Sequence, residues 1–325
     1  MDTDTSTRSV KWAAKREALD TRARYFIMAA ARIAAGLLWL ANLHWKVPPN
    51  FGEDTGGGLY KFTVSAVDNP VWGVYSWFTE EVILPNYHLF GWIVILIDGT
   101  LAALLLIGYR TRIVALVGAF NAIPIFLSVL YYDQADEWPW SYALIFFLHL
   151  MLFAVPPGEH APRIDMALRA GRPARNRAFV VLGVIAVLVG AIGWYLARDV
   201  DFATRQVAMF GHAQWELKLL WFNGLAAVLT IALGTALIVG ARLRVVGLAA
   251  SGGFALMALI ALLQQNWNNV SKGPPAIIGT ASNAAFWAMF AVAGAVMFRA
   301  DQRELRRDAG AIGDTTRLLR EDSPA

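Results

Sequence analysis

Four polar side chains lie inside long apolar stretches of this sequence, namely Arg32, Asp98, Asn121 and His149. At about 1.5 Å per helical residue, each lies roughly 9–14 Å from the same side of a membrane. A carboxylate in hydrocarbon needs a partner or a use, and Arg32 is the predicted partner of Asp98. The four groups predict a polar layer that holds a quinone head group or passes protons, with Asp98, Arg32 and His149 catalytic and Asn121 binding the cofactor.

The alternative interpretation of the same layer is structural. A buried pair of Arg32 and Asp98 can fix the register of two helices without taking part in chemistry. Asn121 and His149 would then be ordinary core residues with satisfied hydrogen bonds. No second intramembrane histidine stands at the depth of His149, which argues against haem ligation.

A second polar and aromatic group marks the other rim of the membrane. It contains His44, Lys46 and Trp140, with Trp45, Tyr87, His88 and Trp138 nearby. We expect His44, Lys46 and Trp140 to be cofactor-binding residues if this rim is the mouth of a quinone site. The alternative is an aromatic belt from which Lys46 extends to water.

The composition identifies an integral membrane protein. Of the 325 residues, 57% are hydrophobic and 16% are charged, whereas about 25% of the residues of a soluble domain are charged. The chain has no cysteine, which excludes disulfide relays, iron–sulfur clusters and cysteine-ligated zinc. We found no metal-ligand motif and no phosphate-binding glycine loop, so we predict no metal. The net charge of +4 does not indicate nucleic-acid binding.

The fold class is all-α, with eight transmembrane helices. The apolar stretches lie near residues 26–45, 87–107, 113–132, 138–156, 178–197, 217–239, 244–263 and 280–298. A long outer loop, residues 46–86, contains a segment suited to the membrane interface, Pro70–Pro85. Residues 1–24 form a cytoplasmic N-terminal segment, and residues 300–325 form a cytoplasmic tail.

A repeated turn divides the chain into two halves. Gly-x-Arg-x-Arg occurs at Gly108–Arg112 and again at Gly240–Arg244, each time between two apolar stretches. We therefore predict tandem four-helix bundles over residues 25–170 and 171–299. Thr230 stands in the second half where the first has Asp98, so the polar site is expected in the first half alone.

Basic residues set the orientation. With residue 1 inside, the inner segments hold 21 of the 28 Lys and Arg residues, while six lie in or beside outer loops and one, Arg32, lies within a span. This asymmetry predicts cytoplasmic termini for a multi-pass protein of the plasma (inner) membrane.

The first half resembles the DoxX/DoxD family of bacterial membrane proteins. The matching features are Arg32-x3-Gly36 followed by Lys46, Asp98 ten residues before Gly108, Gly108-x-x-Thr111-Arg112, Trp140-x-Tyr142, and Gly158 followed by Asp165-x-x-Leu168. Thr79–Asn86 is most similar to the DoxD branch, the large-loop subunit of thiosulfate:quinone oxidoreductase. The resemblance implies a redox-linked four-helix module that works with a partner subunit.

The leading functional hypothesis is a DoxX/DoxD-like component of a quinone-linked oxidoreductase, with quinone as the cofactor. Its partners would be membrane lipid and a protein subunit on the outer or inner face. A second hypothesis is a non-enzymatic scaffold that recruits redox or envelope proteins. A third is a transporter built from two parallel repeats.

The orientation is testable by labelling single cysteines, because the native chain has none. A cysteine introduced at position 56 should react with a membrane-impermeant reagent added outside intact cells, whereas one at position 171 should react only after lysis. The reverse pattern would contradict cytoplasmic termini.

Overall fold

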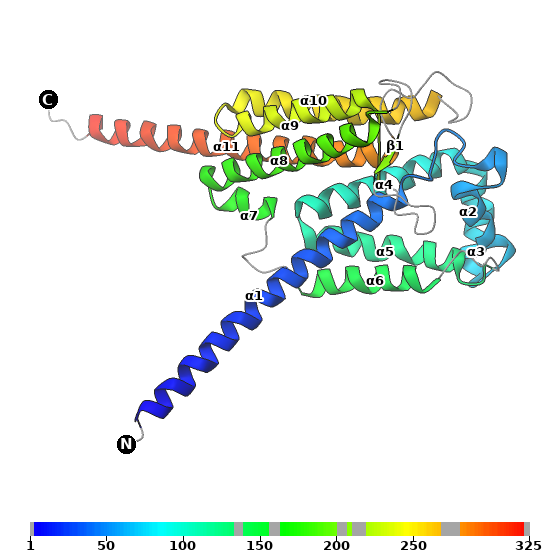
Figure 1. The fold of residues 1–325 in the computed structure, drawn as a ribbon, viewed down its shortest axis with the longest axis horizontal. Coiled ribbons are helices and arrows are strands. Elements are labelled where there is room, and N and C mark those ends of the chain that lie inside the picture. Colours follow the sequence, from blue (N-terminus) through cyan, green and yellow to red (C-terminus); the bar gives the residue numbers. More distant parts are fainter. Residues whose placement is uncertain are drawn as a thin grey trace.

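The computed structural model describes residues 3–132, 139–155, 163–199, 207–209, 219–267 and 280–321 (Figure 1). Helices dominate this part of the chain, and one small two-stranded sheet accompanies them. Six helical segments are long and apolar enough to cross a membrane: Lys15–Asn42, Gly73–Ile107, Thr111–Val129, Arg172–Ala197, Arg244–Leu263 and Ala281–Ala309. The chain is therefore an all-α, multi-pass membrane protein. Trp140–Ala154 and Gly224–Gly240 are shorter apolar helices.

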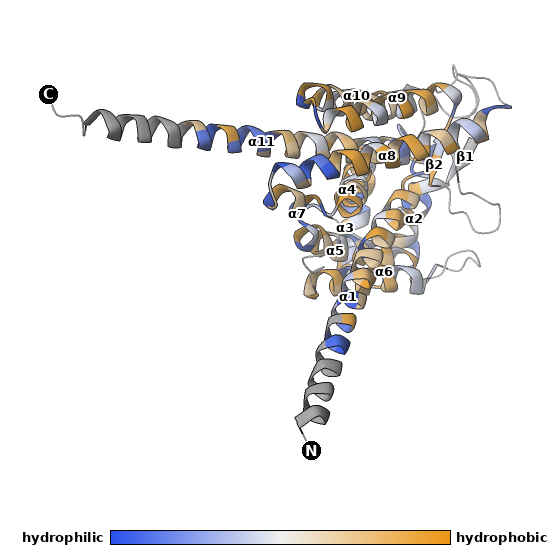
Figure 2. Ribbon diagram, turned by 60° about the vertical axis from the view of Figure 1, so that its left-hand side comes forward, coloured by the Kyte–Doolittle hydropathy of each residue, from blue (hydrophilic) through white to orange (hydrophobic). Residues whose placement is uncertain are grey.

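The helices of the first half pack around one another. They are α1 (Thr3–Asn42), α4 (Tyr87–Ile107), α5 (Thr111–Val129) and α6 (Pro139–Ala154). Helix α1 contacts α4 and α6, and α5 contacts the same two helices. Hydrophobic residues predominate along α4, α5 and α6 (Figure 2), as expected of helices in a membrane.

The second half contains α7 (Ile164–Arg169), α8 (Arg172–Ala197), α9 (Gly224–Gly240), α10 (Arg244–Trp267) and α11 (Ala281–Glu321). Helices α8, α9, α10 and α11 contact one another in chain order, and α11 also packs against α4 and α1 of the first half. Small residues let α8 and α9 approach closely. A Cβ atom on Gly183 would lie 2.6 Å from the carbonyl oxygen of Gly234, a small-residue contact typical of membrane helices.

The two copies of the repeated turn differ in conformation. Gly108 ends α4 in the left-handed region, with φ of 67°, and its N–H bonds the carbonyls of Leu104 and Leu105. Gly240 instead remains helical, and a Cβ atom there would lie 2.3 Å from the Cα atom of Gly247. The first glycine makes a turn, whereas the second permits close packing of α9 and α10.

The long loop folds onto the first half. It contains a 3-10 turn (Glu53–Thr55), α2 (Gly58–Asp68), α3 (Gly73–Phe78), a π-helical turn (Thr79–Ile83) and a second 3-10 turn (Leu84–Asn86) that leads into α4. Phe51 is fully buried, and its carbonyl accepts a hydrogen bond from the Tyr87 hydroxyl at 3.1 Å. Its ring fits against Gly91, where a Cβ atom would lie 2.3 Å away. These contacts hold the loop against α4.

The second half departs from the sequence prediction at the start of its second predicted span. The predicted span at 217–239 begins as a helix only at Gly224, because Leu220–Phe222 forms strand β2 antiparallel to β1, Val207–Met209. Asn283 of α11 holds β2, since its side-chain amide donates to the Trp221 carbonyl at 2.8 Å and accepts from the Trp221 N–H at 2.9 Å. An isolated three-residue strand leaves little periodic signal, so the sequence did not predict it.

Both terminal segments are continuous with helices of the body. Helix α1 begins at Thr3, and α11 extends to Glu321, so neither the N-terminal segment nor the tail is a separate element. At the start of the tail, Asp301 is buried and accepts a 2.5 Å hydrogen bond from Arg175 Nε of α8. Its carboxylate also forms an ion pair with Arg244 of α10. These ion pairs fix α11 to two neighbouring helices.

Candidate functional site

The most buried charges of the first half form an ion pair between α4 and the end of α1. Asp98 lies near the middle of α4 with none of its surface exposed, and the Lys46 ammonium contacts its carboxylate with 2% of the residue exposed. Asn42 Nδ2 donates to Oδ2 of Asp98 at 3.3 Å, and Asn121 Nδ2 donates to Oδ1 at 2.8 Å. Both carboxylate oxygens are therefore hydrogen bonded, as a buried charge requires.

The end of α1 places two of these donors together. Asn42 is the last residue of α1, and Lys46 follows it by four residues in a turn whose N–H groups bond back along the chain. The Lys46 Nζ lies 4.9 Å from the centroid of the Trp45 ring, a cation–π contact. The turn thus directs Lys46 inward, toward α4.

The predicted pairing of Arg32 with Asp98 is wrong. Arg32 is buried, but its Nη1 donates to the carbonyl of Leu105 and, at 2.8 Å, to that of Leu106, at the end of α4. Along α1, Arg32 lies ten residues before Asn42, which corresponds to about 15 Å. Counting depth along each helix assigned similar levels to Arg32 and Asp98. An arginine side chain is too short to span the distance between the level of Arg32 and the level of Asn42, where Asp98 lies.

The interpretation of Lys46 as a side chain extending to water is also wrong. A lysine at the rim of a membrane commonly reaches for the aqueous phase. Here the long loop covers the end of α1, and Asp98 lies within reach of Lys46 in the interior of the helix bundle. The ion pair with Asp98, and not hydration, therefore compensates for the free-energy cost of burying the Lys46 ammonium.

His149 belongs to a different contact. Its Nε2 accepts a hydrogen bond from Trp39 Nε1 at 2.8 Å, and its Nδ1 lies 2.7 Å from the Ile145 carbonyl. An acceptor at Nε2 and a donor at Nδ1 define the neutral tautomer. The ring packs against Gly118, where a Cβ atom would lie 2.2 Å from the imidazole. Both nitrogens are occupied, so His149 joins α6 to α1.

The predicted polar layer therefore divides into three levels along α1. Arg32 lies at the first, Trp39 with His149 at the second, and Asn42 with Lys46, Asp98 and Asn121 at the third. Of the remaining predicted residues, His44 bonds its own helix through Nδ1 and the Ala41 carbonyl at 2.6 Å. Trp140 is 67% exposed, and Trp138 lies outside the described residues.

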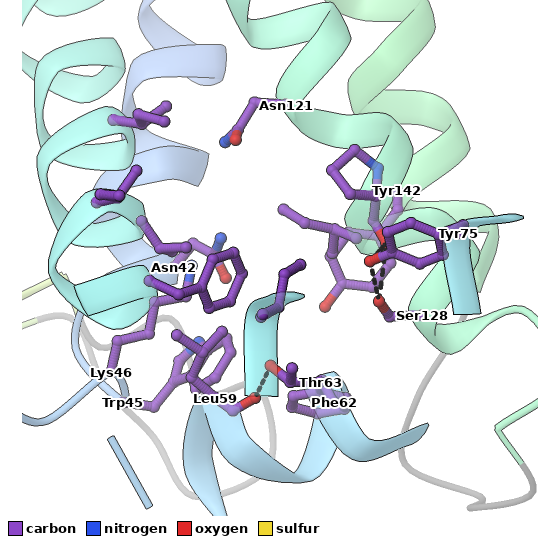
Figure 3. Close-up of a pocket in the computed structure, with 17 residues that line it drawn as sticks. Asn42, Trp45, Lys46, Leu59, Phe62, Thr63, Tyr75, Asn121, Ser128 and Tyr142 are labelled. Carbon is purple, nitrogen blue, oxygen red and sulfur yellow. Dashed lines mark hydrogen bonds between the residues drawn. The ribbon is translucent and has the colours of Figure 1, made fainter. Parts of the chain in front are cut away.

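A cavity of about 130 Å³ adjoins the third level (Figure 3). Three partners of Asp98 line it, namely Asn42, Lys46 and Asn121, whereas Asp98 itself lies behind them. His44, Trp140, His149 and Arg32 are not among its lining residues. The polar groups at one end of the cavity come from α5, from the end of α1 and from the turn that follows α1. Residues of α2, α3, α4 and α6 form its walls.

The opposite wall carries hydroxyl groups that the sequence analysis missed. The Tyr75 hydroxyl of α3 lies 2.9 Å from Ser128 Oγ and donates to the Pro124 carbonyl at 3.1 Å. Tyr142 of α6 lies beside them, and Thr63 of α2 lies lower in the cavity, next to Leu59 and Phe62 (Figure 3). Asn42 was also missed, although its place four residues before Lys46 is a signal that would have found it. The remaining lining is apolar: Leu59, Phe62, Ile83, Phe90, Ile93, Val94, Ile97, Ile125, with Trp45 and Pro124.

The corresponding position of the second half carries no charge. Thr230 is fully buried, its Oγ1 donates to the Ala226 carbonyl at 2.7 Å, and it accepts from Trp287 Nε1 at 3.0 Å. This hydrogen bond joins α9 to α11 within an aromatic core. The two halves therefore differ at the position where the first half has its buried acid.

No group of three or more His, Cys, Asp or Glu suited to a metal ion occurs in the part of the chain that the structure describes. Comparisons with protein-family models, curated proteins and solved structures found no match. The arguments about function therefore rest on the residues and their geometry.

The pairing of Asp98 is testable with double-mutant cycles. Asp98→Asn and Lys46→Met should each lower the free energy of unfolding by about 3–5 kcal/mol, because each leaves one buried charge unpaired. The double variant should cost much less than the sum of the two. Denaturant unfolding of the purified protein in detergent micelles measures all three values.

The matched control replaces Arg32, which also lies on α1 but does not reach Asp98. Arg32→Gln and Asp98→Asn should have additive effects on the free energy of unfolding. Coupling of Asp98 to Arg32 and not to Lys46 would restore the pairing predicted from the sequence.

Proposed function

We propose that the cavity binds the head group of a quinone and that this chain is the membrane component of a quinone-linked oxidoreductase. Its partner would be a subunit of the thiosulfate:quinone type or another subunit that donates electrons. One observation carries the proposal. A buried carboxylate holds three nitrogen donors at one end of an otherwise apolar cavity in the membrane part of the protein.

The three donors suit a carbonyl oxygen. A lysine ammonium has three N–H groups and a carboxamide has two, and each of Lys46, Asn42 and Asn121 directs one to Asp98. The remaining N–H groups would donate to an acceptor in the cavity. The ammonium would also stabilise negative charge on a partly reduced quinone, because electrostatic interactions are strong in an apolar site.

The size and walls of the cavity suit a six-membered ring. Its volume of about 130 Å³ is similar to the roughly 150 Å³ of an engineered apolar cavity that admits benzene. Ile93 of α4 lines the cavity and is 44% exposed on the outer surface of the bundle. A hydrophobic tail would leave beside this residue toward the lipid.

The proposal includes eight membrane spans in two four-helix bundles with cytoplasmic termini. Helix α6 has 16 residues and α9 has 17, which is short for a span of about 20 residues, but α6 packs along α5 and α9 along α8. In this orientation α2 and α3 lie on the outer side. The electron donor would approach there, because these two helices form part of the cavity wall.

The asymmetry between the halves favours this function over transport by two equivalent repeats. A transporter of that kind places its substrate site at the interface of the repeats. The buried charges at Asp98 and Lys46 lie wholly within the first half, and Thr230 of the second half is engaged by Trp287. The second half would then serve as a support for the first.

A photoreactive quinone tests the proposal. Irradiation of the purified protein with an azido-quinone, followed by peptide mapping, should label segments that line the cavity in α1, α2, α4 and α5. Asn121→Leu keeps a similar side-chain volume but removes a donor, so it should weaken quinone binding about tenfold, the effect of losing roughly 1–2 kcal/mol of hydrogen bonding.

Thr230→Val is the matched control, because it removes a buried polar group at the corresponding position of the second half. It should leave the dissociation constant for the quinone within twofold of the native value. Equal losses in Asn121→Leu and Thr230→Val, or labelling confined to peptides remote from the cavity, would contradict the proposal.

A further inference from the structure

A groove of about 410 Å³ lies between the first half and the start of the second. One side consists of Arg32 and Ile33 of α1 and Leu106 and Ile107 of α4. The other side consists of α7, the first half of α8, and Arg163, which immediately precedes α7 (Figure 1). This groove is separate from the cavity at Lys46, with which it shares no lining residue.

Three arginines line the groove. Arg32 is buried, Arg163 is half-buried and Arg177 is exposed. The Arg163 Nε is buried and has no hydrogen-bond partner among the described residues. Burial lowers the pKa of the Arg163 guanidinium, Asp165 raises it and Arg169 lowers it further. The nearby acid, Asp165, also accepts the backbone N–H of Arg110 through Oδ2 at 2.8 Å.

The rest of the groove is apolar and runs along α8. Ala174, Ala178, Val181 and Ile185 line it at helical spacing, so they share one face of the helix. Ile185 lies eight residues beyond Arg177, which corresponds to about 12 Å. Val181 is 55% exposed and Ile185 39% exposed. The groove therefore combines three arginines with a hydrophobic trough along α8.

From this arrangement we infer that the groove binds an anionic phospholipid, with its phosphate at Arg163 and Arg177 and one acyl chain along Val181 and Ile185. A guanidinium matches the geometry of a phosphate, and basic pockets between membrane helices on the cytoplasmic side bind anionic lipid head groups. In the proposed orientation the three arginines face the inner leaflet. The lipid would then join α7 and α8 of the second half to α1 and α4 of the first.

Native mass spectrometry of the protein released from nanodiscs tests this inference. With equal amounts of phosphatidylglycerol and phosphatidylcholine, the protein should retain phosphatidylglycerol preferentially. Arg177→Gln should reduce the retained phosphatidylglycerol about fivefold, since one basic side chain near a membrane surface contributes about that factor. Arg172→Gln is the control, because Arg172 is an exposed residue of the same helix that does not line the groove.

A second variant tests the hydrophobic part of the site. Ala178→Trp fills the trough without changing charge, and it should displace the lipid to a similar extent. Inorganic phosphate at millimolar concentration should not displace it, because phosphate lacks the acyl chain. Equal retention of both lipids, equal losses in Arg177→Gln and Arg172→Gln, or displacement by inorganic phosphate would each overturn the assignment of an anionic phospholipid.

Discussion

The burial of Asp98 is the constraint on which the first half depends. An unpaired carboxylate in a membrane helix is strongly unfavourable, and removal of the partner from a buried pair costs about 3–5 kcal/mol. Lys46 satisfies this charge from outside the span, so the chain must turn sharply after α1 and direct the lysine inward. The long loop then covers the pair, held by Phe51 against α4. The cavity lies where this cover meets α4 and α5.

Asp98 acts on the cavity through its neighbours. It does not line the cavity, but three of its hydrogen-bond partners do. An acceptor-only carboxylate can orient several donors at once, so one acid determines the direction of an ammonium and two carboxamides. On the proposed function, Asp98 is a positioning residue, and Lys46, Asn42 and Asn121 contact the quinone.

Much of the fold follows from hydropathy and turn chemistry in the sequence. Each predicted apolar stretch contains a helix, although the one at 217–239 begins with strand β2. Gly108 predicts the hairpin that the structure shows. Depth along each helix placed Asn121 at the level of Asp98, and the two side chains are hydrogen bonded. The same count failed for Arg32 and His149, because it does not record which face of a helix a residue occupies or which backbone groups lie nearby. The burial of Lys46 could not be predicted from the sequence, because it depends on how the long loop folds over the end of α1.

On the proposed function, a ligand in the cavity changes the hydrogen bonding of the Asp98 carboxyl group, because the ligand and Asp98 share the same donors. Infrared difference spectroscopy of the native protein against Asp98→Asn isolates the signal of this carboxyl group. We expect the band of this carboxyl group to shift when a short-chain quinone is added, because the ligand competes for the donors that Asp98 holds. A band of the Asp98 carboxyl group that saturating quinone leaves unchanged would contradict the account.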